Sequence, residues 1–205
     1  MVLELKKFVV GPLRTNVYLL INELSEGILI DAGPGSFYRV LYLVDRGLVR
    51  LRYILLTHAH FDHASDAQYI KEVTGAKIVM HIADKEVFIN SSYMAHYFGV
   101  RWNDPEVDIY ILDDCLLRLL EIDTEVITTP GHTPGSVCYY VPKLHMLFTG
   151  DTLFKGAIGK PYIRKGSERL LKTSLRKLRA LPLHTRVLPG HGDETSLDVE
   201  FQSVK

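Results

Sequence analysis

The sequence predicts an α/β fold in which two β-sheets pack face to face with helices on their outer sides. Short apolar strands followed by a helical pattern occur twice, once in each half of the chain. That order is typical of a layered α/β sandwich. With 205 residues, 47% of them hydrophobic, the chain is long enough to bury a full core. We therefore expect one domain spanning residues 1–205.

The first half opens with three short runs rich in β-branched residues. Glycine, proline and polar turns separate these runs, as in antiparallel strands. After them, Phe37, Val40 and Val44 recur at intervals of three and four, which predicts a helix. The elements expected here are strands at 5–10, 17–21, 27–30, 53–56 and 77–80, a helix around 37–44, and a helix at 66–74 closed by Gly75.

The middle of the chain, residues 83–114, carries six aromatic side chains around a polar break at 103–105. We expect a helical excursion and loop that can cover a site. Beyond it, leucines at helical spacing predict a late helix at 167–181. The strands expected in the second half are 125–128, 136–141, 144–148 and 186–188.

Composition excludes several classes of function. The 24 basic and 24 acidic residues cancel, so nucleic acid is not an expected partner. No window approaches 18 uninterrupted apolar residues and the start of the chain lacks a secretory pattern, so we expect no membrane span and a cytoplasmic location. The two cysteines, Cys115 and Cys138, match no metal-ligand or redox spacing. Cys138 lies in an apolar run and is predicted to be a buried, inert thiol.

The most informative stretch follows the strand predicted at 53–56. Residues two apart in an extended run point the same way, so His58 and His60 can reach one ion. The chain must then turn for the next two ligand-type side chains to face another point. Four candidate ligands fall within six positions: His58, His60, Asp62 and His63.

Three further candidates, His132, Asp151 and His191, each follow a predicted strand. Glycine or proline flanks each of them, which places a ligand on a rigid turn that other groups can approach closely. If the sheets pack as predicted, all these loops converge on one edge. Imidazole and carboxylate without thiolate suit zinc, iron or manganese.

Seven ligands are too many for one tetrahedral zinc, so we divide them between two ions. Asp151 is the natural bridge, and each ion keeps an open position for water, as catalytic sites do. The four remaining histidines, His81, His96, His145 and His184, lack comparable settings, and all of them except His96 are predicted to be structural or surface residues. The division assigns His58, His60 and His132 to one ion and Asp62, His63 and His191 to the other.

The string His58-x-His60-x-Asp62-His63, followed by the three later candidates, resembles the metallo-β-lactamase superfamily. Residues 130–136 and 150–154 look most like its glyoxalase II (hydroxyacylglutathione hydrolase) branch. The resemblance implies a four-layer αβ/βα sandwich, two mixed sheets flanked by helices, with a two-metal site at one edge. Glyoxalase II enzymes continue into a C-terminal helical domain, which the 14 residues after His191 cannot form.

The implied function is that of a metal-dependent hydrolase in which metal-bound hydroxide attacks a carbonyl carbon. We expect two divalent ions, zinc first and iron or manganese as alternatives, with Asp62 and Asp151 as catalytic residues. A thiolate, with an ordinary pKa near about 8.5, departs with little protonation, so a small thioester fits best. The candidate substrate contacts are Lys160 and Tyr162 for an anionic group and Tyr93 and His96 in an aromatic wall, with an exposed loop or ordinary core packing as the alternatives.

Three other functions stay open. An iron-dependent persulfide dioxygenase would use one iron held by His58, His132 and Asp151. A phosphodiesterase or nuclease would use the same two-metal site, against the neutral charge of the chain. A non-enzymatic binding module has no evident use for open coordination positions. The sequence leaves the oligomeric state open.

Overall fold

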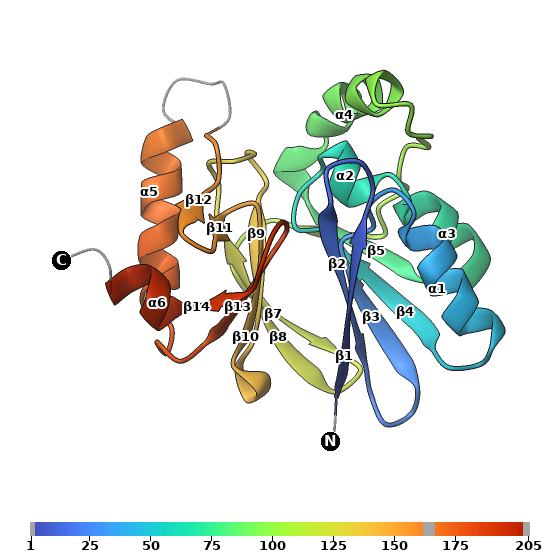
Figure 1. The fold of residues 1–205 in the computed structure, drawn as a ribbon, viewed down its shortest axis with the longest axis horizontal. Helices are drawn as coiled ribbons and strands as arrows, with labels where there is room; N and C mark the ends of the chain where they lie inside the picture. The colour runs from blue at the N-terminus through green and yellow to red at the C-terminus, as the bar shows by residue number, and fades with distance from the viewer. Residues whose placement is uncertain (1–2, 162–166, 203–205) are drawn as a thin grey trace. The chain divides into compact units, whose positions relative to one another are not determined.

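The computed structural model describes residues 3–161 and 167–202 (Figure 1). The chain divides into two compact units, Met1–Tyr110 and Ile111–Lys205. Each unit carries a six-stranded sheet that mixes parallel and antiparallel neighbours and has helices against it. The predicted fold class, two mixed sheets flanked by helices, is confirmed.

In the first unit the strands follow one another in chain order across the sheet. The strands are β1 (Glu4–Val10), β2 (Thr15–Ile21), β3 (Glu26–Ile30), β4 (Arg50–Leu55), β5 (Lys77–His81) and β6 (Ile109–Ile111). The helices are α1 (Ser36–Asp45), α2 (Phe61–Ala64), α3 (Ala67–Thr74) and α4 (Val87–Tyr97), with a 3-10 turn η1 (Ile82–Asp84). β1, β2 and β3 pair antiparallel, whereas β3, β4 and β5 pair parallel. Parallel neighbours need crossover connections, which α1 and α3 supply.

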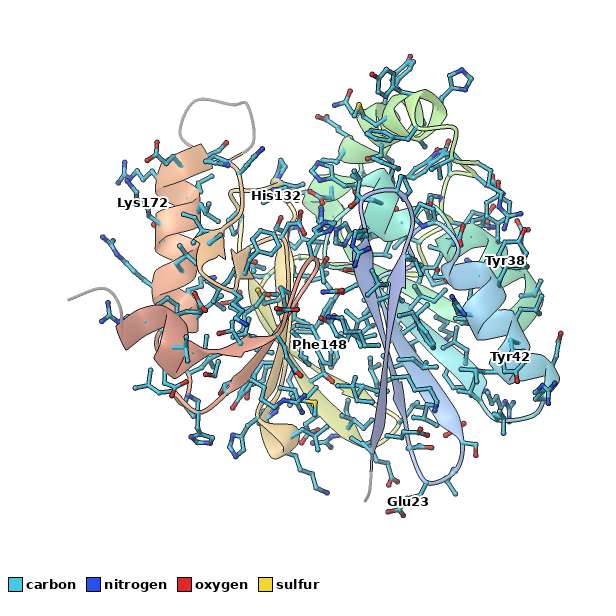
Figure 2. The ribbon with its side chains drawn as sticks, in the orientation of Figure 1. Glu23, Tyr38, Tyr42, His132, Phe148 and Lys172 are labelled. Carbon is cyan, nitrogen blue, oxygen red and sulfur yellow. The ribbon has the colours of Figure 1, made fainter. Side chains whose placement is uncertain are left out.

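The core of this unit lies between the sheet and these two crossover helices (Figure 1). Val40 of α1 and Ile70 of α3 are fully buried against strand residues such as Ile54. On the opposite side of α1, Tyr38 and Tyr42 point to solvent (Figure 2). The three- and four-residue spacing of α1 thus buries one face and leaves aromatic rings on the other.

The start of α1 depends on the side chain of Asp66, the residue that precedes α3. Gly35 precedes the helix and offers no capping oxygen, so the backbone N–H groups of Gly35 and Phe37 donate to Asp66 Oδ2, at 2.7 and 2.9 Å. Burial raises the pKa of Asp66, against the lowering effect of these two hydrogen bonds. Asp66 therefore joins the N-terminus of α1 to that of α3. Gly75 closes α3 in the left-handed conformation, as predicted.

In the second unit the sheet has the order β14-β13-β10-β9-β8-β7. Its strands are β7 (Cys115–Leu119), β8 (Ile122–Thr128), β9 (Val137–Val141), β10 (Met146–Gly150), β13 (Arg186–Pro189) and β14 (Thr195–Ser196), beside a separate hairpin of β11 (Leu153–Phe154) and β12 (Ala157–Ile158). The helices are α5 (Ser167–Leu178) and α6 (Leu197–Gln202), with a 3-10 turn η2 (Pro142–Leu144). α5 packs its apolar face on the sheet, and Leu178 is buried against Cys138, Leu147 and Val187. Phe148 of β10 is buried as well (Figure 2).

Three predicted boundaries in this unit need correction. The strand expected from residue 125 begins at Ile122. The strand expected from residue 144 begins at Met146, because η2 occupies 142–144 and His145 adopts a left-handed conformation with φ 48°. The helix expected to reach residue 181 ends at Leu178 and continues as a hydrogen-bonded turn, in which Leu181 N–H donates to Leu178 O. The excursion predicted at 83–114 contains η1 and α4, and it ends in β6 and an extended segment.

The predicted state of Cys138 is confirmed, because the thiol is buried and burial raises its pKa to about 12. Cys115 is exposed. Among the residues that the structure describes, no helix has the length and hydropathy needed to cross a membrane.

Candidate metal centre

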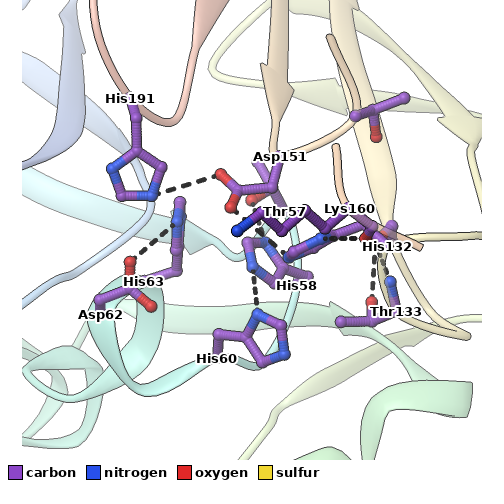
Figure 3. Close-up of polar contacts among 12 residues, drawn as sticks. Thr57, His58, His60, Asp62, His63, His132, Thr133, Asp151, Lys160 and His191 are labelled. Carbon is purple, nitrogen blue, oxygen red and sulfur yellow. Dashed lines mark hydrogen bonds and ion pairs between the residues drawn. The ribbon is translucent and has the colours of Figure 1, made fainter. Parts of the chain in front are cut away.

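The segment after β4 supplies four of the predicted ligands, all within the first unit (Figure 3). His60 has an extended backbone with ψ 148°, and α2 begins at the next residue. His58 and His60 therefore precede the helix, whereas Asp62 and His63 lie in its first turn. The chain turns where the spacing of the motif requires it.

The four side chains gather closely. His58 Nε2 lies 3.1 Å from His60 Nδ1, and His63 Nε2 lies 3.4 Å from Asp62 Oδ2. The rings of His58 and His63 have their centroids 4.2 Å apart. His58, Asp62 and His63 are buried and His60 is partly exposed, so solvent touches the cluster mainly at His60.

Two buried side chains outside the predicted set hold these ligands. Asp31 Oδ2 lies 2.8 Å from His63 Nδ1, and the other oxygen of Asp31 accepts from the backbone N–H of Thr57 at 2.8 Å. A carboxylate on Nδ1 leaves Nε2 of His63 for an ion, which is the usual arrangement behind a metal-bound histidine. Thr15 Oγ1 donates to Asp62 Oδ2 at 3.0 Å.

Sequence reasoning missed both residues. Asp31 carried a usable signal, since it follows an apolar strand and precedes glycine and proline, as the later ligands do. Thr15 carried none, because a threonine in a strand is ordinary.

The second unit gathers the other three predicted ligands. His132 follows β8, Asp151 follows β10 and His191 follows β13. Asp151 Oδ2 lies 3.5 Å from His132 Nε2, and Asp151 Oδ1 lies 3.5 Å from His191 Nε2 (Figure 3). Because β10 and β13 are parallel, their carboxyl ends meet at the same edge of the sheet. Each oxygen of Asp151 thus faces one histidine.

The loop at 159–160 fixes this group through its backbone. Lys160 O lies 3.0 Å from His132 Nδ1, so Nδ1 donates to it and Nε2 is left to face Asp151. A Cβ on Gly159 would lie 1.8 Å from Asp151 O, so only glycine fits there. Lys160 was predicted to contact substrate through its side chain, which is exposed. Tyr162, predicted beside it, lies outside the described residues.

The aromatic segment divides into two parts. Phe88 and Trp102 have ring centroids 6.0 Å apart and pack on the core of the first unit, as the core-packing alternative expects. Tyr93 and His96 are exposed on α4, where they can meet a solute. Their contact with substrate stays a prediction.

The donor set fits a hard or borderline cation. All seven predicted ligands are among the side chains that could hold a metal ion. Imidazole nitrogens and carboxylate oxygens suit zinc, iron and manganese, and neither cysteine belongs to the set. Of the four histidines outside the set, the three predicted to be structural or surface residues make contacts of that kind: His81 accepts from Ala83 N–H, and the rings of His145 and His184 meet edge to face with centroids 4.2 Å apart.

Mixed sheets with histidine and aspartate at their strand ends are the features of a metal-binding α/β protein. A family model of the metallo-beta-lactamase superfamily matches residues 10–191, and the chain belongs to this superfamily. The predicted family resemblance is therefore confirmed.

Named relatives and solved structures extend over almost the whole chain. The probable metallo-hydrolase YqgX of Bacillus subtilis is 36% identical over 200 residues, 95% of this chain and 93% of that protein. The hydroxyacylglutathione hydrolase GloC of Haemophilus influenzae is 30% identical over 203 residues, 95% and 93% of the two chains.

The crystal structure of BLEG-1, titled a B3 metallo-beta-lactamase, matches with TM-score 0.87 at 31% identity over 97% of both chains. TTHA1623, solved in a di-iron-bound form, matches with TM-score 0.83 at 32% identity over 95% of this chain and 96% of that one.

Proposed function

We propose that this chain hydrolyses thioesters with two divalent metal ions, and that the two clusters of ligands form one binuclear site. Three histidines would hold one ion and the second group would hold the other, and Asp151 is the carboxylate that the two ions would share. The observation that carries the proposal is Asp151, whose two carboxylate oxygens each face a different histidine at 3.5 Å. The assigned ligands are His58, His60 and His132 for one ion and Asp62, His63 and His191 for the other.

When bound, two such ions supply a water of lowered pKa and an electrophile for a carbonyl oxygen. The residues of this chain orient the side chains that would bind the ions. Asp31 and Lys160 O each hold the Nδ1 side of a histidine, so that Nε2 points to the site. Thr15 Oγ1 donates to Asp62 Oδ2 and so fixes the direction of this carboxylate, which would orient the attacking water. Fixed donors and acceptors of this kind need no reorganisation during the reaction.

The chemistry of the leaving group and the names of two relatives support a thioester as the substrate class. A thiolate needs little protonation to depart, so the site requires no strong general acid. GloC of Haemophilus influenzae and a protein of Pelagibacter ubique, 31% identical over 184 residues, are both named hydroxyacylglutathione hydrolases. We propose a small acyl thioester, with Lys160 and Tyr162 near its anionic group and Tyr93 and His96 along its acyl or thiol part. A cytoplasmic location is part of the same proposal.

We propose zinc as the bound metal, with iron as the alternative. The di-iron form of the similar protein TTHA1623 supports a two-ion site and keeps iron in consideration. One iron with oxygen uptake would instead favour the dioxygenase function.

The test combines elemental analysis of the purified protein with a screen of thioesters, phosphodiesters and β-lactams. The expected result is two ions per chain and turnover of thioesters without oxygen consumption. Asp151→Ala and His60→Ala should each abolish turnover while the circular dichroism spectrum is retained. Full activity in either variant, or turnover of phosphodiesters alone, would contradict the proposal. The screen includes β-lactams because the structurally similar protein BLEG-1 is named a B3 metallo-beta-lactamase.

A further inference from the structure

The peptide backbone between two of the proposed ligands is held by two side chains outside the ligand set. Asp84 Oδ2 accepts a hydrogen bond from Ala59 N–H at 2.9 Å. Ser91 Oγ donates to Ala59 O at 2.7 Å. Both side chains are buried, and Ala59 itself is fully buried. The two polar groups of one residue are thus fixed by two other residues.

This arrangement controls both neighbouring histidines. The N–H of Ala59 belongs to the peptide plane shared with His58, and its C=O belongs to the plane shared with His60. Because both peptide planes are held by hydrogen bonds, the directions of the Cα–Cβ bonds of His58 and His60 are fixed. The ring nitrogens of the two histidines face each other at 3.1 Å, a separation that depends on both directions.

The two holding residues come from the segment that the sequence analysis interpreted as a cover for the site. Asp84 ends the 3-10 turn after β5, and Ser91 lies on the buried side of α4. A second contact joins the same elements, since Phe61 of α2 stacks on Phe98 with ring centroids 5.2 Å apart. The segment is therefore attached to the ligand loop at several points.

We propose that Asp84 and Ser91 are positioning residues that hold His58 and His60 in the geometry that binds metal. The inference rests on the proposed metal site. The competing explanation is that they only satisfy buried backbone groups, as any buried N–H and C=O must be satisfied. The two explanations predict different metal affinities for variants of Asp84 and Ser91. If the role is purely structural, a variant loses stability but the folded protein binds metal as tightly as before.

The experiment compares Asp84→Ala, Asp84→Asn and Ser91→Ala with a matched control, Asp108→Asn. Asp108 Oδ2 accepts from the backbone N–H of Ile78 at 2.8 Å, much as Asp84 does from Ala59, but it lies beside β5 and touches no ligand. Each protein is stripped of metal, and zinc is titrated against a chromophoric chelator. Urea unfolding of the metal-free proteins measures stability separately.

Loss of either hydrogen bond should weaken zinc binding by about 10- to 100-fold, the usual effect of removing an outer-shell partner. Asp84→Asn should bind zinc better than Asp84→Ala, because its amide oxygen still accepts from Ala59 N–H. Asp108→Asn should lose stability and keep the affinity of the parent protein. The absorption spectrum of bound cobalt should change in the Asp84 and Ser91 variants and stay unchanged in the control.

Wild-type zinc affinity in folded Ser91→Ala and Asp84→Ala would overturn the inference while leaving the proposed function intact. Ser91→Ala removes a single oxygen, so it decides the question if Asp84→Ala does not fold. A parent protein that binds no divalent ion would overturn both proposals.

Discussion

At the residue scale, two glycines let backbone segments approach the ligands. A Cβ on Gly33 would lie 2.1 Å from Asp62 O, and one on Gly159 would lie 1.8 Å from Asp151 O. Neither glycine needs a left-handed conformation, so what matters at both positions is space. Each glycine lets a neighbouring loop lie against the backbone of a proposed ligand.

Gly159→Ala should therefore damage the site. The added methyl group forces the backbone of Asp151 away, and it also meets His132 Cβ at 3.5 Å. A displacement of about 1 Å at a reacting group can lower the rate by about 100-fold. The measurement is kcat/KM for the thioester substrate, with circular dichroism to verify folding.

The control for this variant is Gly156→Ala. Gly156 has open space around its Cβ position but a φ of +71°, so alanine there adds backbone strain without a clash. That variant should lose about 1–2 kcal/mol of stability and keep its activity. Normal activity in Gly159→Ala would show that the loop at 159–160 does not determine where Asp151 lies.

Asp66 gives a prediction about pH. Burial raises its folded pKa above the ordinary value of 3.8, so the folded state holds the proton more tightly than the unfolded state. The stabilisation that comes from this tighter proton binding is fully present below pH 3.8, the ordinary pKa of the group. It is lost as the pH rises through the pKa of the folded state. Asp66→Asn releases no proton and keeps an acceptor oxygen. Its stability relative to wild type should therefore rise as the pH increases to neutrality.

Asp108 provides the opposite case for the same measurement. Burial alone would raise its pKa, but the N–H of Ile78 and the ammonium of Lys71 outweigh burial and lower it. Its stability contribution is present above the unfolded pKa and is lost as the pH falls through the folded pKa. Urea midpoints of metal-free Asp66→Asn and Asp108→Asn, each relative to wild type, should move in opposite directions with pH. Parallel curves would refute the assigned cause for Asp66.

Sequence reasoning identified the proposed ligands but missed the residues that hydrogen-bond to them. The difference lies in whether the signal is local in the sequence or depends on a partner far along the chain. The proposed ligands stand out locally, since four of them fall within six positions after an apolar run and the other three each sit beside glycine. The residues that hold them do not. Thr15 is 47 positions from Asp62, Asp31 is 32 from His63, and Asp84 is 25 from Ala59. Only the folded chain brings such pairs together, so no local pattern could identify them.

At the element scale, all but one of the predicted strands lie in the interior of a sheet, and the exception is the edge strand β1. β2, β3 and β9 are buried almost throughout and therefore appear as continuous apolar runs. The elements missed are short or lie at an edge. β6 and β14 have three and two residues, and β7 is an edge strand exposed over most of its length. Their residues follow no periodicity long enough to detect.

Helix α5 offers a direct test of helix packing. Leu178 is fully buried against the second sheet, whereas Leu170 on the same helix is 48% exposed. Leu178→Ala should cost about 2–5 kcal/mol, the range for truncating a buried leucine. Leu170→Ala should cost far less, because water already reaches its side chain. Urea unfolding of the two variants measures both values, and equal losses would contradict the packing of α5 described above.

At the scale of the whole molecule, the proposed ligands divide between the two compact units. Four belong to Met1–Tyr110 and three to Ile111–Lys205. The expectation of a single domain stays a prediction, because compactness alone does not show whether the units unfold together. If the proposed ions take ligands from both units, metal should couple their unfolding.

Two natural probes can test that coupling. Trp102 is the only tryptophan and packs against Phe88 in the first unit. Cys138 is buried in the second unit, and burial raises the pKa of its thiol to about 12, so it reacts with thiol reagents only after local or global unfolding. Cys115 is exposed, so it is first replaced by Cys115→Ser to leave one reporting thiol.

Zinc at a free concentration of about 100 times its Kd should add about 2.7 kcal/mol to the stability of whatever it binds as a unit. Because the proposed ions bridge ligands from both units, tryptophan fluorescence and Cys138 labelling should show urea midpoints that rise together on adding zinc and fall together on chelation. Asp151→Ala, which removes the proposed bridge, should weaken this joint response. A midpoint that rises for one probe alone would mean that the metal is held by one unit, which would contradict the shared binuclear site.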